Sequence, residues 1–142
     1  MIVILDTDHL TAIQRRAEPA CMNIQSRLKQ MSHATDCTTI VNFEEQMRGW
    51  LSLIGPSTKR GQELFAYERL QSLVAFFAEI PVIGYDQAAA DQTAALRRLK
   101  LRIGSMDLKI AAIAMSRDAV LASANLRDFG RIQGLRVEDL LK

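Results

Sequence analysis

The chain begins with an apolar run that ends at an acidic residue. The run is Ile2-Val3-Ile4-Leu5, and most of its residues are β-branched. A strand without polar residues on either face is typical of a parallel sheet that helices cover on both sides. Asp6 then stands at the carboxyl end of this strand, where open α/β sheets bind their ligands. Alternatively, Asp6, Thr7 or Asp8 has only a structural role and caps the helix that follows.

Strand and helix patterns alternate along most of the remaining chain. Helices are predicted near 9–17, 20–31, 43–51, 58–79, 86–99 and 106–115, and short strands near 37–41, 81–84, 119–122 and 135–137. Residues 126–129 are predicted to form a single helical turn or a loop. Strands that alternate with helices predict an α/β fold with a mainly parallel central sheet flanked by helices.

Several details of this prediction concern single residues. Asn42 stands where a cap is expected before the helix at 43–51, and Ser105 is placed to cap the helix that follows it. Apolar residues recur at mostly helical spacing through 58–79, which predicts a wide apolar face on that helix. His9 and His33 have no partner at metal-ligand spacing, so each is expected to be a surface or capping residue.

Length and composition indicate one globular domain. A chain of 142 residues can bury a sizeable core without disulfides, and 1–142 is predicted to form a single domain. No apolar run approaches the length of a membrane span, and the chain starts on a core strand without a signal sequence, so a cytoplasmic protein is expected. Cys21 and Cys37 are too few for a zinc cluster, and free or buried thiols are expected.

Four acidic residues lie at similar positions relative to the predicted strands and helices. Asp6, Glu45 and Asp128 lie at the end of a predicted strand or shortly after it, and Asp107 opens a helix that precedes a strand. A single convergence at the carboxyl edge of the sheet would bring all four together. Magnesium and manganese prefer oxygen ligands and can activate a water molecule against a phosphodiester. The sequence therefore predicts a site for Mg²⁺ or Mn²⁺.

Positive charge is concentrated between residues 96 and 102. The net charge of the chain is only +2, which by itself does not indicate a nucleic-acid-binding protein. The stretch nevertheless holds four cations, Arg97, Arg98, Lys100 and Arg102, and further pairs stand at 15–16 and 59–60. Acids around a metal and cations around its rim can hold a phosphate backbone while the total charge stays near zero. The alternative is that these cations belong to solvated helix faces.

The segments around the four acids resemble those of PIN-domain ribonucleases. They are Asp6 after the first strand, Glu45-Gln46-Met47-Arg48-Gly49, Gly104-Ser105-Met106-Asp107-Leu108-Lys109-Ile110-Ala111-Ala112, and Ser123-Ala124-Asn125-Leu126-Arg127-Asp128-Phe129. They occur in the order of the family and at similar intervals, from Met1 to about Leu140. Within the family, the chain is most similar to the VapC-type toxins of bacterial toxin–antitoxin modules. The resemblance implies a PIN-like α/β fold.

The resemblance also implies roles for single residues. In the family the second acid lies four residues before a glycine, which selects Glu45 over the adjacent Glu44. Catalytic and metal-binding roles are implied for Asp6, Glu45, Asp107 and Asp128. Supporting roles are implied for Ser123, Asn125 and Asp8, and Ser123 stands where the family often has threonine.

The activity implied by the resemblance is endonucleolytic hydrolysis of RNA that depends on Mg²⁺ or Mn²⁺, with water as the nucleophile. A VapB-like antitoxin that blocks the groove and a toxin homodimer are implied as well. Arg97, Arg98, Lys100 and Arg102 would then contact RNA phosphates. The residues alone support the acid cluster and the fold class, and RNA as substrate follows from the resemblance.

Two other functions fit parts of the sequence. Asp6-Thr7-Asp8 after a strand also resembles the opening motif of haloacid-dehalogenase-type phosphatases, in which the first aspartate is a nucleophile and the second a general acid. Those enzymes need a late acidic pair beside a strand, whereas Ser123-Ala124-Asn125 stands at that point here. The other alternative is a PIN-like module that binds RNA or protein without catalysis, and the presence of all four acids argues against it.

Overall fold

The chain folds into a five-stranded parallel sheet with helices on both faces. The computed structural model describes all residues from 1 to 142. The strands are β1 (Ile2–Leu5), β2 (Thr35–Thr39), β3 (Val82–Ile83), β4 (Val120–Ala122) and β5 (Arg136–Glu138), and their order in the sheet is β3-β2-β1-β4-β5. Every neighbouring pair is parallel. The predicted parallel α/β fold is therefore confirmed, with β1 at the centre of the sheet.

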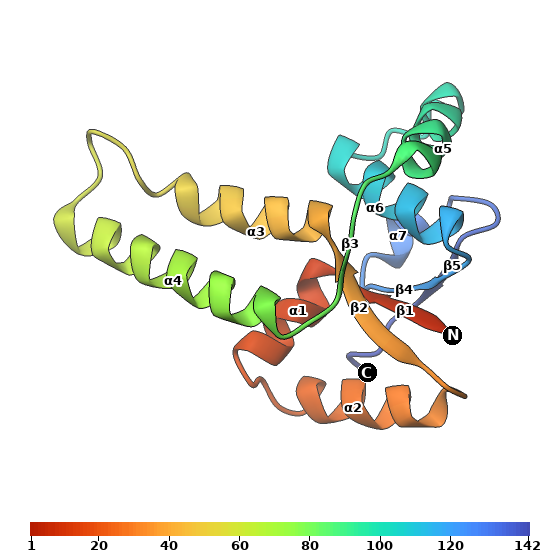
Figure 1. Cartoon of the computed structure of the whole chain (residues 1–142), viewed down its shortest axis with the longest axis horizontal. Coiled ribbons are helices and arrows are strands. Elements are labelled where there is room, and N and C mark those ends of the chain that lie inside the picture. Colours follow the sequence, from red (N-terminus) through yellow and green to blue (C-terminus); the bar gives the residue numbers. More distant parts are fainter.

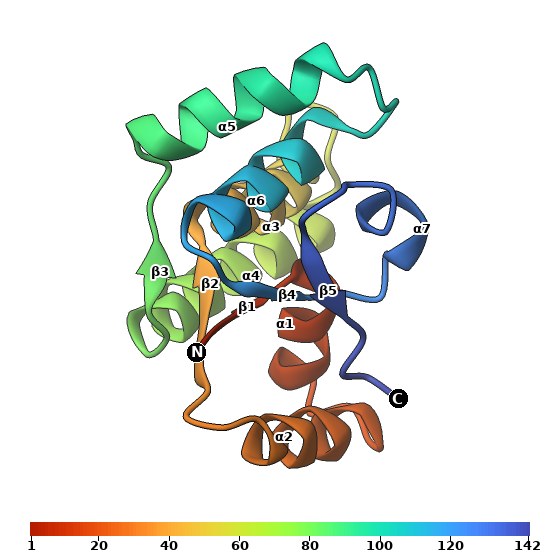
Figure 2. The ribbon, with the colours of Figure 1, turned by 90° about the vertical axis from the view of Figure 1, so that its right-hand side faces the viewer.

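Seven helices connect and cover the strands. They are α1 (Thr7–Gln14), α2 (Ala20–Gln30), α3 (Ile40–Leu51), α4 (Arg60–Ala78), α5 (Gln87–Arg98), α6 (Ser105–Ser116) and α7 (Leu126–Phe129). Figure 1 shows α3 and α4 as an antiparallel pair that extends away from the sheet. Figure 2 shows α5 and α6 on one side of the sheet and α1 and α2 on the other. None of the helices is long and apolar enough to cross a membrane.

The two faces of β1 belong to two separate parts of the core. Ile4 packs in a cluster of 16 buried residues that includes the apolar face of α6. Val3 and Leu5 belong to a second cluster with Leu10 of α1 and Ile24 of α2. Successive side chains of a strand point to opposite faces, so an apolar residue is needed at each of these positions. The unbroken apolar run at the start of the chain follows from this double burial.

The junction of β2 and α3 differs from the prediction. The strand ends at Thr39 and the helix begins at Ile40, so the β-branched pair Ile40-Val41 is helical. Thr39 is the cap, because its Oγ1 accepts a hydrogen bond of 3.2 Å from the backbone N–H of Asn42. The prediction that Asn42 caps this helix is wrong. Asn42 lies inside the first turn of α3 and is fully buried.

The predicted cap of α6 is also wrong. Gly104 occupies the cap position and no side chain closes the first turn, while Ser105 is the first helical residue. The Oγ of Ser105 instead accepts a hydrogen bond from Arg97 Nη2 at 3.3 Å. Ser105 therefore contacts the end of α5 and does not satisfy a free N–H group of its own helix.

The wide apolar face predicted for α4 joins the core only near the end of the helix, where Phe76 and Phe77 pack against the cluster that contains Val3 and Leu5. Only Ala66 and Leu73 are buried on this helix, whereas Leu64 is 61% and Val74 68% exposed. The reason is that α4 packs mainly along α3 as both extend away from the sheet (Figure 1). Most apolar side chains of α4 have no core opposite them.

Candidate active site

Asp6 lies at the carboxyl end of β1 and is held by three hydrogen bonds. Its side chain is buried, with 7% of the residue exposed. Oδ1 accepts from the backbone N–H of Thr7 and from Asn42 Nδ2, both at 2.9 Å, and Oδ2 accepts from Ser123 Oγ at 2.7 Å. Burial raises the pKa of Asp6, and these hydrogen bonds offset only part of that effect. Asp6 thus caps α1 and also stands at the edge of the sheet where a ligand is expected.

Asn42 is a site residue that the sequence analysis assigned only as a cap. Its Nδ2 also donates to Thr7 Oγ1 at 3.2 Å, and its Oδ1 accepts from Thr39 Oγ1 at 2.7 Å. The amide is therefore fixed from both ends and turned toward Asp6. The signal in the sequence was its position three residues before Glu45, since residues three apart share one face of a helix.

The two adjacent glutamates of α3 point to different surroundings. Glu45 Oε1 accepts a hydrogen bond from Thr7 Oγ1, so its carboxylate lies next to Asp6. Glu44 forms an ion pair with Arg48 at 2.7 Å along the outer face of the helix. Burial raises the pKa of Glu45, and the charges of Asp6 and Asp8 raise it further. Glu45, and not Glu44, is the glutamate that faces the other acids.

Asn125 connects the remaining two acids. Its Nδ2 lies 3.5 Å from Asp107 Oδ2 and 3.4 Å from Asp128 Oδ2. Asp107 comes from the first turn of α6, and Asn125 and Asp128 come from the cap and the body of α7. Burial raises the pKa of Asp107 to about 6, with further contributions from the charges of Asp6, Glu45, Asp128 and Asp8. The acids from four segments of the chain therefore act electrostatically on one another.

The four acids are chemically suited to bind a hard cation, but their carboxylates are not gathered around one point. None of Asp6, Glu45, Asp107 and Asp128 is paired with a lysine or arginine of the chain, so their charge is not balanced internally. All four offer carboxylate oxygens, which Mg²⁺ and Mn²⁺ prefer. No three acidic, histidine or cysteine side chains lie close enough to form a ready metal-binding group. Asp6 instead accepts hydrogen bonds from Ser123 and Asn42, and Glu45 accepts one from Thr7.

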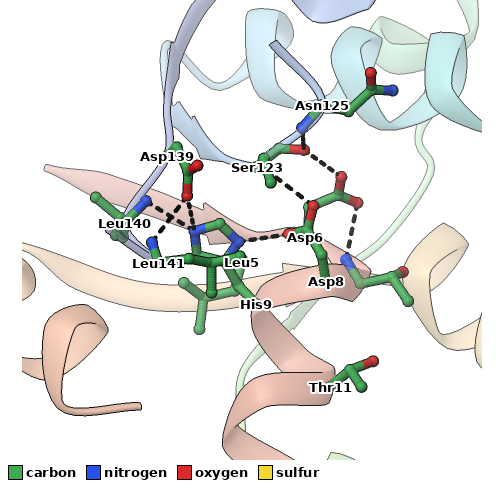
Figure 3. Close-up of polar contacts among 12 residues, drawn as sticks. Leu5, Asp6, Asp8, His9, Thr11, Ser123, Asn125, Asp139, Leu140 and Leu141 are labelled. Carbon is green, nitrogen blue, oxygen red and sulfur yellow. Dashed lines mark hydrogen bonds and ion pairs between the residues drawn. The ribbon is translucent and has the colours of Figure 1, made fainter. Parts of the chain in front are cut away.

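Asp8 supports the loop after β4, and its charge also acts on the acid cluster. Its Oδ2 accepts a hydrogen bond of 2.9 Å from the backbone N–H of Ala124, and its Oδ1 accepts from His9 Nδ1 (Figure 3). Burial alone would raise the pKa of Asp8, but the hydrogen bonds from His9 and Ala124 outweigh it and lower the pKa. Because Ala124 stands between Ser123 and Asn125, Asp8 helps to position both of these site residues.

His9 is fully buried, so the prediction of a surface or capping residue is wrong. Its Nε2 accepts a hydrogen bond of 3.0 Å from the backbone N–H of Leu140. In the neutral ring the proton must then lie on Nδ1, from which it is donated to Asp8. His9 therefore links the segment after β5 to the loop that carries Ser123 and Asn125, as Figure 3 shows. His33, in contrast, is exposed.

The basic stretch lies beside the helix that carries Asp107. Its four cations, Arg97, Arg98, Lys100 and Arg102, are exposed and form no ion pair with an acid of the chain. The contact between Arg97 and Ser105 places the end of α5 at the first turn of α6. Asp107 is two residues further along this turn. The cations are thus free to meet an anionic partner at the helix that carries Asp107.

Both cysteines are free thiols, as expected from the sequence. Cys37 is buried within β2, and this burial raises the pKa of its thiol to about 11. A thiol with such a pKa stays protonated at neutral pH and is a poor nucleophile. The cysteines therefore take no part in the candidate site.

Sequence comparison finds two curated proteins similar to part of the chain. One is described as tRNA(fMet)-specific endonuclease VapC from Shigella flexneri, with 38% identity over 74 residues, or 49% of this chain and 56% of that protein. The other has the same description, comes from Salmonella typhimurium and is 37% identical over 83 residues, or 55% of this chain and 63% of that protein. The matched region thus spans little more than half of each relative. No family model matches the chain.

Structure comparison covers nearly the whole chain. The VapBC-1 structure from nontypeable Haemophilus influenzae matches with a TM-score of 0.75 and 21% identity, over 100% of both chains. The DNA-bound VapBC structure from Salmonella typhimurium matches with a TM-score of 0.71 and 28% identity, over 99% of this chain and 98% of that chain. The resemblance to VapC-type proteins that the segments around the four acids predicted is thus confirmed, in sequence over about half of the chain and in fold over nearly all of it.

Proposed function

We propose that the protein is a metal-dependent endoribonuclease, the toxin of a VapBC-like toxin–antitoxin pair, and that residues 1–142 form its single catalytic domain in the cytoplasm. The observation that carries this proposal is that Asp6, Glu45, Asp107 and Asp128 come from four segments of the chain, have no basic partner and lie close enough for their charges to act on one another. Burial raises the pKa of Asp107 to about 6, and the charges of the other acids add to this rise. Uncompensated carboxylates of this kind are stabilised by a bound cation.

Mg²⁺ or Mn²⁺ bound at this site would activate a water molecule and stabilise the leaving oxygen of a phosphodiester. Asp6, Glu45, Asp107 and Asp128 would hold the cation through carboxylate oxygens. Asn42 and Ser123 fix the orientation of Asp6, Thr7 fixes that of Glu45, and Asn125 bridges Asp107 and Asp128. Each acid therefore has a hydrogen-bond donor that positions it, and Asp107 and Asp128 share one.

The substrate and the partners are proposed on separate grounds. RNA is supported by the description of both curated relatives as tRNA-specific endonucleases, so transfer RNA is the first substrate to test. The exposed cations at 97, 98, 100 and 102 would contact its phosphates. A VapB-like antitoxin is supported by the neighbouring structures, which are described as VapBC. A toxin homodimer is proposed from the family resemblance.

The two alternative functions fit the geometry less well. A phosphatase of the haloacid dehalogenase type would use Asp8 as a general acid, but Asp8 is hydrogen-bonded to His9 and Ala124 and has a lowered pKa. A general acid needs a proton near neutral pH and access to the substrate. A module that only binds RNA or protein would have no use for four acids whose charges remain unbalanced.

The experiment that tests the proposal compares the two adjacent glutamates. Glu45→Gln keeps the size and helix propensity of the side chain and removes its charge, so cleavage of RNA should fall by about 100-fold or more while folding survives. Glu44→Gln is the matched control and should leave cleavage nearly unchanged, because Glu44 pairs with Arg48 outside the site. Cleavage of a transfer RNA pool is followed on gels in 5 mM Mn²⁺ or EDTA. Equal activity of Glu45→Gln and the native protein would contradict the proposal.

A further inference from the structure

A groove opens beside the acids between α1, α3 and α4. Its volume is about 520 Å³, which is within the range of about 300–1,000 Å³ for sites that bind small ligands. Its walls include Thr7, Gln14 and Arg15 of α1, Gln46 and Trp50 of α3, and Arg69 of α4. We call this feature the α1–α3 groove.

The α1–α3 groove begins where the acid cluster ends. Thr7 lines the groove and also donates to Glu45 and accepts from Asn42. From Thr7 the groove follows one face of α1 as far as Arg15. Gln46, on the opposite wall, is the residue next to Glu45. A phosphate-containing polymer that places one phosphate at the acids can therefore place the adjoining monomer in this groove.

A pair of amides forms the middle of the groove. Gln14 Nε2 donates to Gln46 Oε1 at 3.0 Å, and Gln46 Nε2 donates back to Gln14 Oε1 at 2.9 Å. Each amide oxygen keeps one further lone pair and Gln14 keeps one further N–H, whereas Gln46 Nε2 also donates to Thr11 Oγ1 at 3.5 Å. A donor and an acceptor side by side match the edge of a nucleobase.

The rim of the groove is cationic. Arg15 and Arg69 are exposed, and neither forms an ion pair with an acid. Arg69 lies over the ring of Phe65, with 5.3 Å between Cζ and the ring centroid, so its guanidinium is held at the rim. Two unpaired guanidinium groups favour an anionic ligand.

We infer that the α1–α3 groove holds the nucleotide next to the scissile phosphate of an RNA substrate. The Gln14–Gln46 pair contacts the edge of its base, and Arg15 and Arg69 contact the flanking phosphates. This inference rests on the proposed ribonuclease activity and assigns the groove as a subsite of the same site. Apart from Trp50, Leu73 and Phe76, the residues that line the groove are polar or glycine, and Arg15 and Arg69 among them are cationic, so RNA suits it better than an apolar protein segment.

The first test fills the groove without disturbing the core. Gly49 lines the groove, and a Cβ added there meets no atom within 4 Å. Gly49→Leu should therefore fold at least as well as the native chain, because leucine favours a helix over glycine. It should lower kcat/KM for RNA by about tenfold or more by occupying the subsite. Gly61→Leu in α4 is the matched control, since a Cβ is equally free there, and it should leave kcat/KM unchanged.

The second test separates charge from base recognition. Arg15→Gln should weaken binding of a single-stranded RNA and reduce the slope of log K against log salt by about 0.7, the value for one phosphate contact, whereas Arg16→Gln should not. Gln46→Met should leave that slope unchanged. It should instead remove about tenfold discrimination at one base beside the cut, which is read by sequencing the cleaved ends of a random RNA pool. Gln71→Met, on the exposed side of α4, is its control.

The results of these tests distinguish a failure of the proposed subsite from a failure of the proposed ribonuclease activity. If the native protein cleaves no RNA in Mg²⁺ or Mn²⁺, the proposed function itself fails. If it cleaves RNA and Gly49→Leu matches Gly61→Leu in kcat/KM, the subsite is overturned and the groove is open to a protein partner. A native cut pattern without any base preference beside the cut would overturn the role of the amide pair.

Discussion

Replacing His9 by phenylalanine tests whether the buried histidine supports the candidate site. Phenylalanine is apolar and of comparable size, so it leaves no large cavity, but it can neither accept from Leu140 nor donate to Asp8. The buried N–H of Leu140 would lose its only acceptor in the structure, and Asp8 would lose the ring donor while it keeps its bond to Ala124. The variant therefore isolates two hydrogen bonds that meet at one ring.

The expected loss of stability follows from the two groups that lose a hydrogen-bond partner, the Leu140 N–H and the Asp8 carboxylate. An unsatisfied buried N–H costs about 1–3 kcal/mol. The Asp8 side chain is 34% exposed, so water can replace much of its lost hydrogen bond and about 1 kcal/mol is expected there. Together His9→Phe should lower the free energy of unfolding by about 2–4 kcal/mol, or the melting temperature by roughly 10 °C.

Thermal melts and amide hydrogen exchange measure this effect. His33→Phe is the matched control, because His33 is exposed, and it should change the stability by less than about 1 kcal/mol. The Leu140 amide should exchange slowly in the native protein and faster in His9→Phe. The reasoning is refuted if His9→Phe melts within 1–2 °C of His33→Phe and the Leu140 amide keeps its protection.

The effect should also depend on pH through Asp8. The pKa of Asp8 is lower in the folded protein than its ordinary value of 3.8, so folding favours the ionised form. This contribution to stability is complete above pH 3.8 and is lost as the pH falls through the lower, folded pKa. Because His9 provides the main hydrogen bond behind the shift, His9→Phe should lose less stability than the native protein during acidification.

Three further predictions concern the acids and the basic stretch. Mn²⁺ or Mg²⁺ at ten times its dissociation constant should stabilise the protein by about 1.4 kcal/mol, and Asp6→Asn should reduce this gain; an unchanged native melting curve at millimolar metal would exclude a shared site. In EDTA, the raised pKa of Asp107 means that its protonated form favours folding, so stability should fall as the pH rises from 3.8 through about 6. Asp107→Asn should flatten that fall in a pH series of melts, and an equally steep fall in the variant would show that other groups cause it. Changing Arg97 and Arg98 together to Gln should weaken RNA binding and reduce its salt dependence without moving the cut. An unchanged salt slope would show that both residues belong only to a solvated helix surface.

The sequence was sufficient for the fold because its signals were local. The apolar run before Asp6 predicted a strand buried on both faces, and β1 is the central strand. Errors occurred where tertiary contacts decide between residues that are equally suitable locally. Thr39 and Asn42 can both cap a helix, and only the position of Asp6 across the sheet explains why Asn42 is drawn inward.

Long-range partners also explain the errors at His9 and α4. His9 is buried because Leu140, 131 residues away, offers it a backbone N–H, and no local pattern contains this information. The apolar spacing of α4 correctly predicted a helix, but spacing does not tell whether a sheet lies opposite. The sequence predicted that the acids converge because parallel strands end at the same edge of a sheet, which is a property of the fold class, but it could not predict that they fall short of a ready metal-binding group.

The hydrogen bonds of Asp6 limit how it can hold a cation. A carboxylate offers about four lone-pair sites. Oδ1 already accepts from Thr7 and Asn42, and Oδ2 accepts from Ser123, so the one remaining site lies on Oδ2. Asp6 can therefore serve a cation through a single oxygen unless one of these donors moves away. Ser123 and Asn42 thereby determine which oxygen of Asp6 is available, and this assigns a chemical role to two polar residues that a search for acids alone does not find.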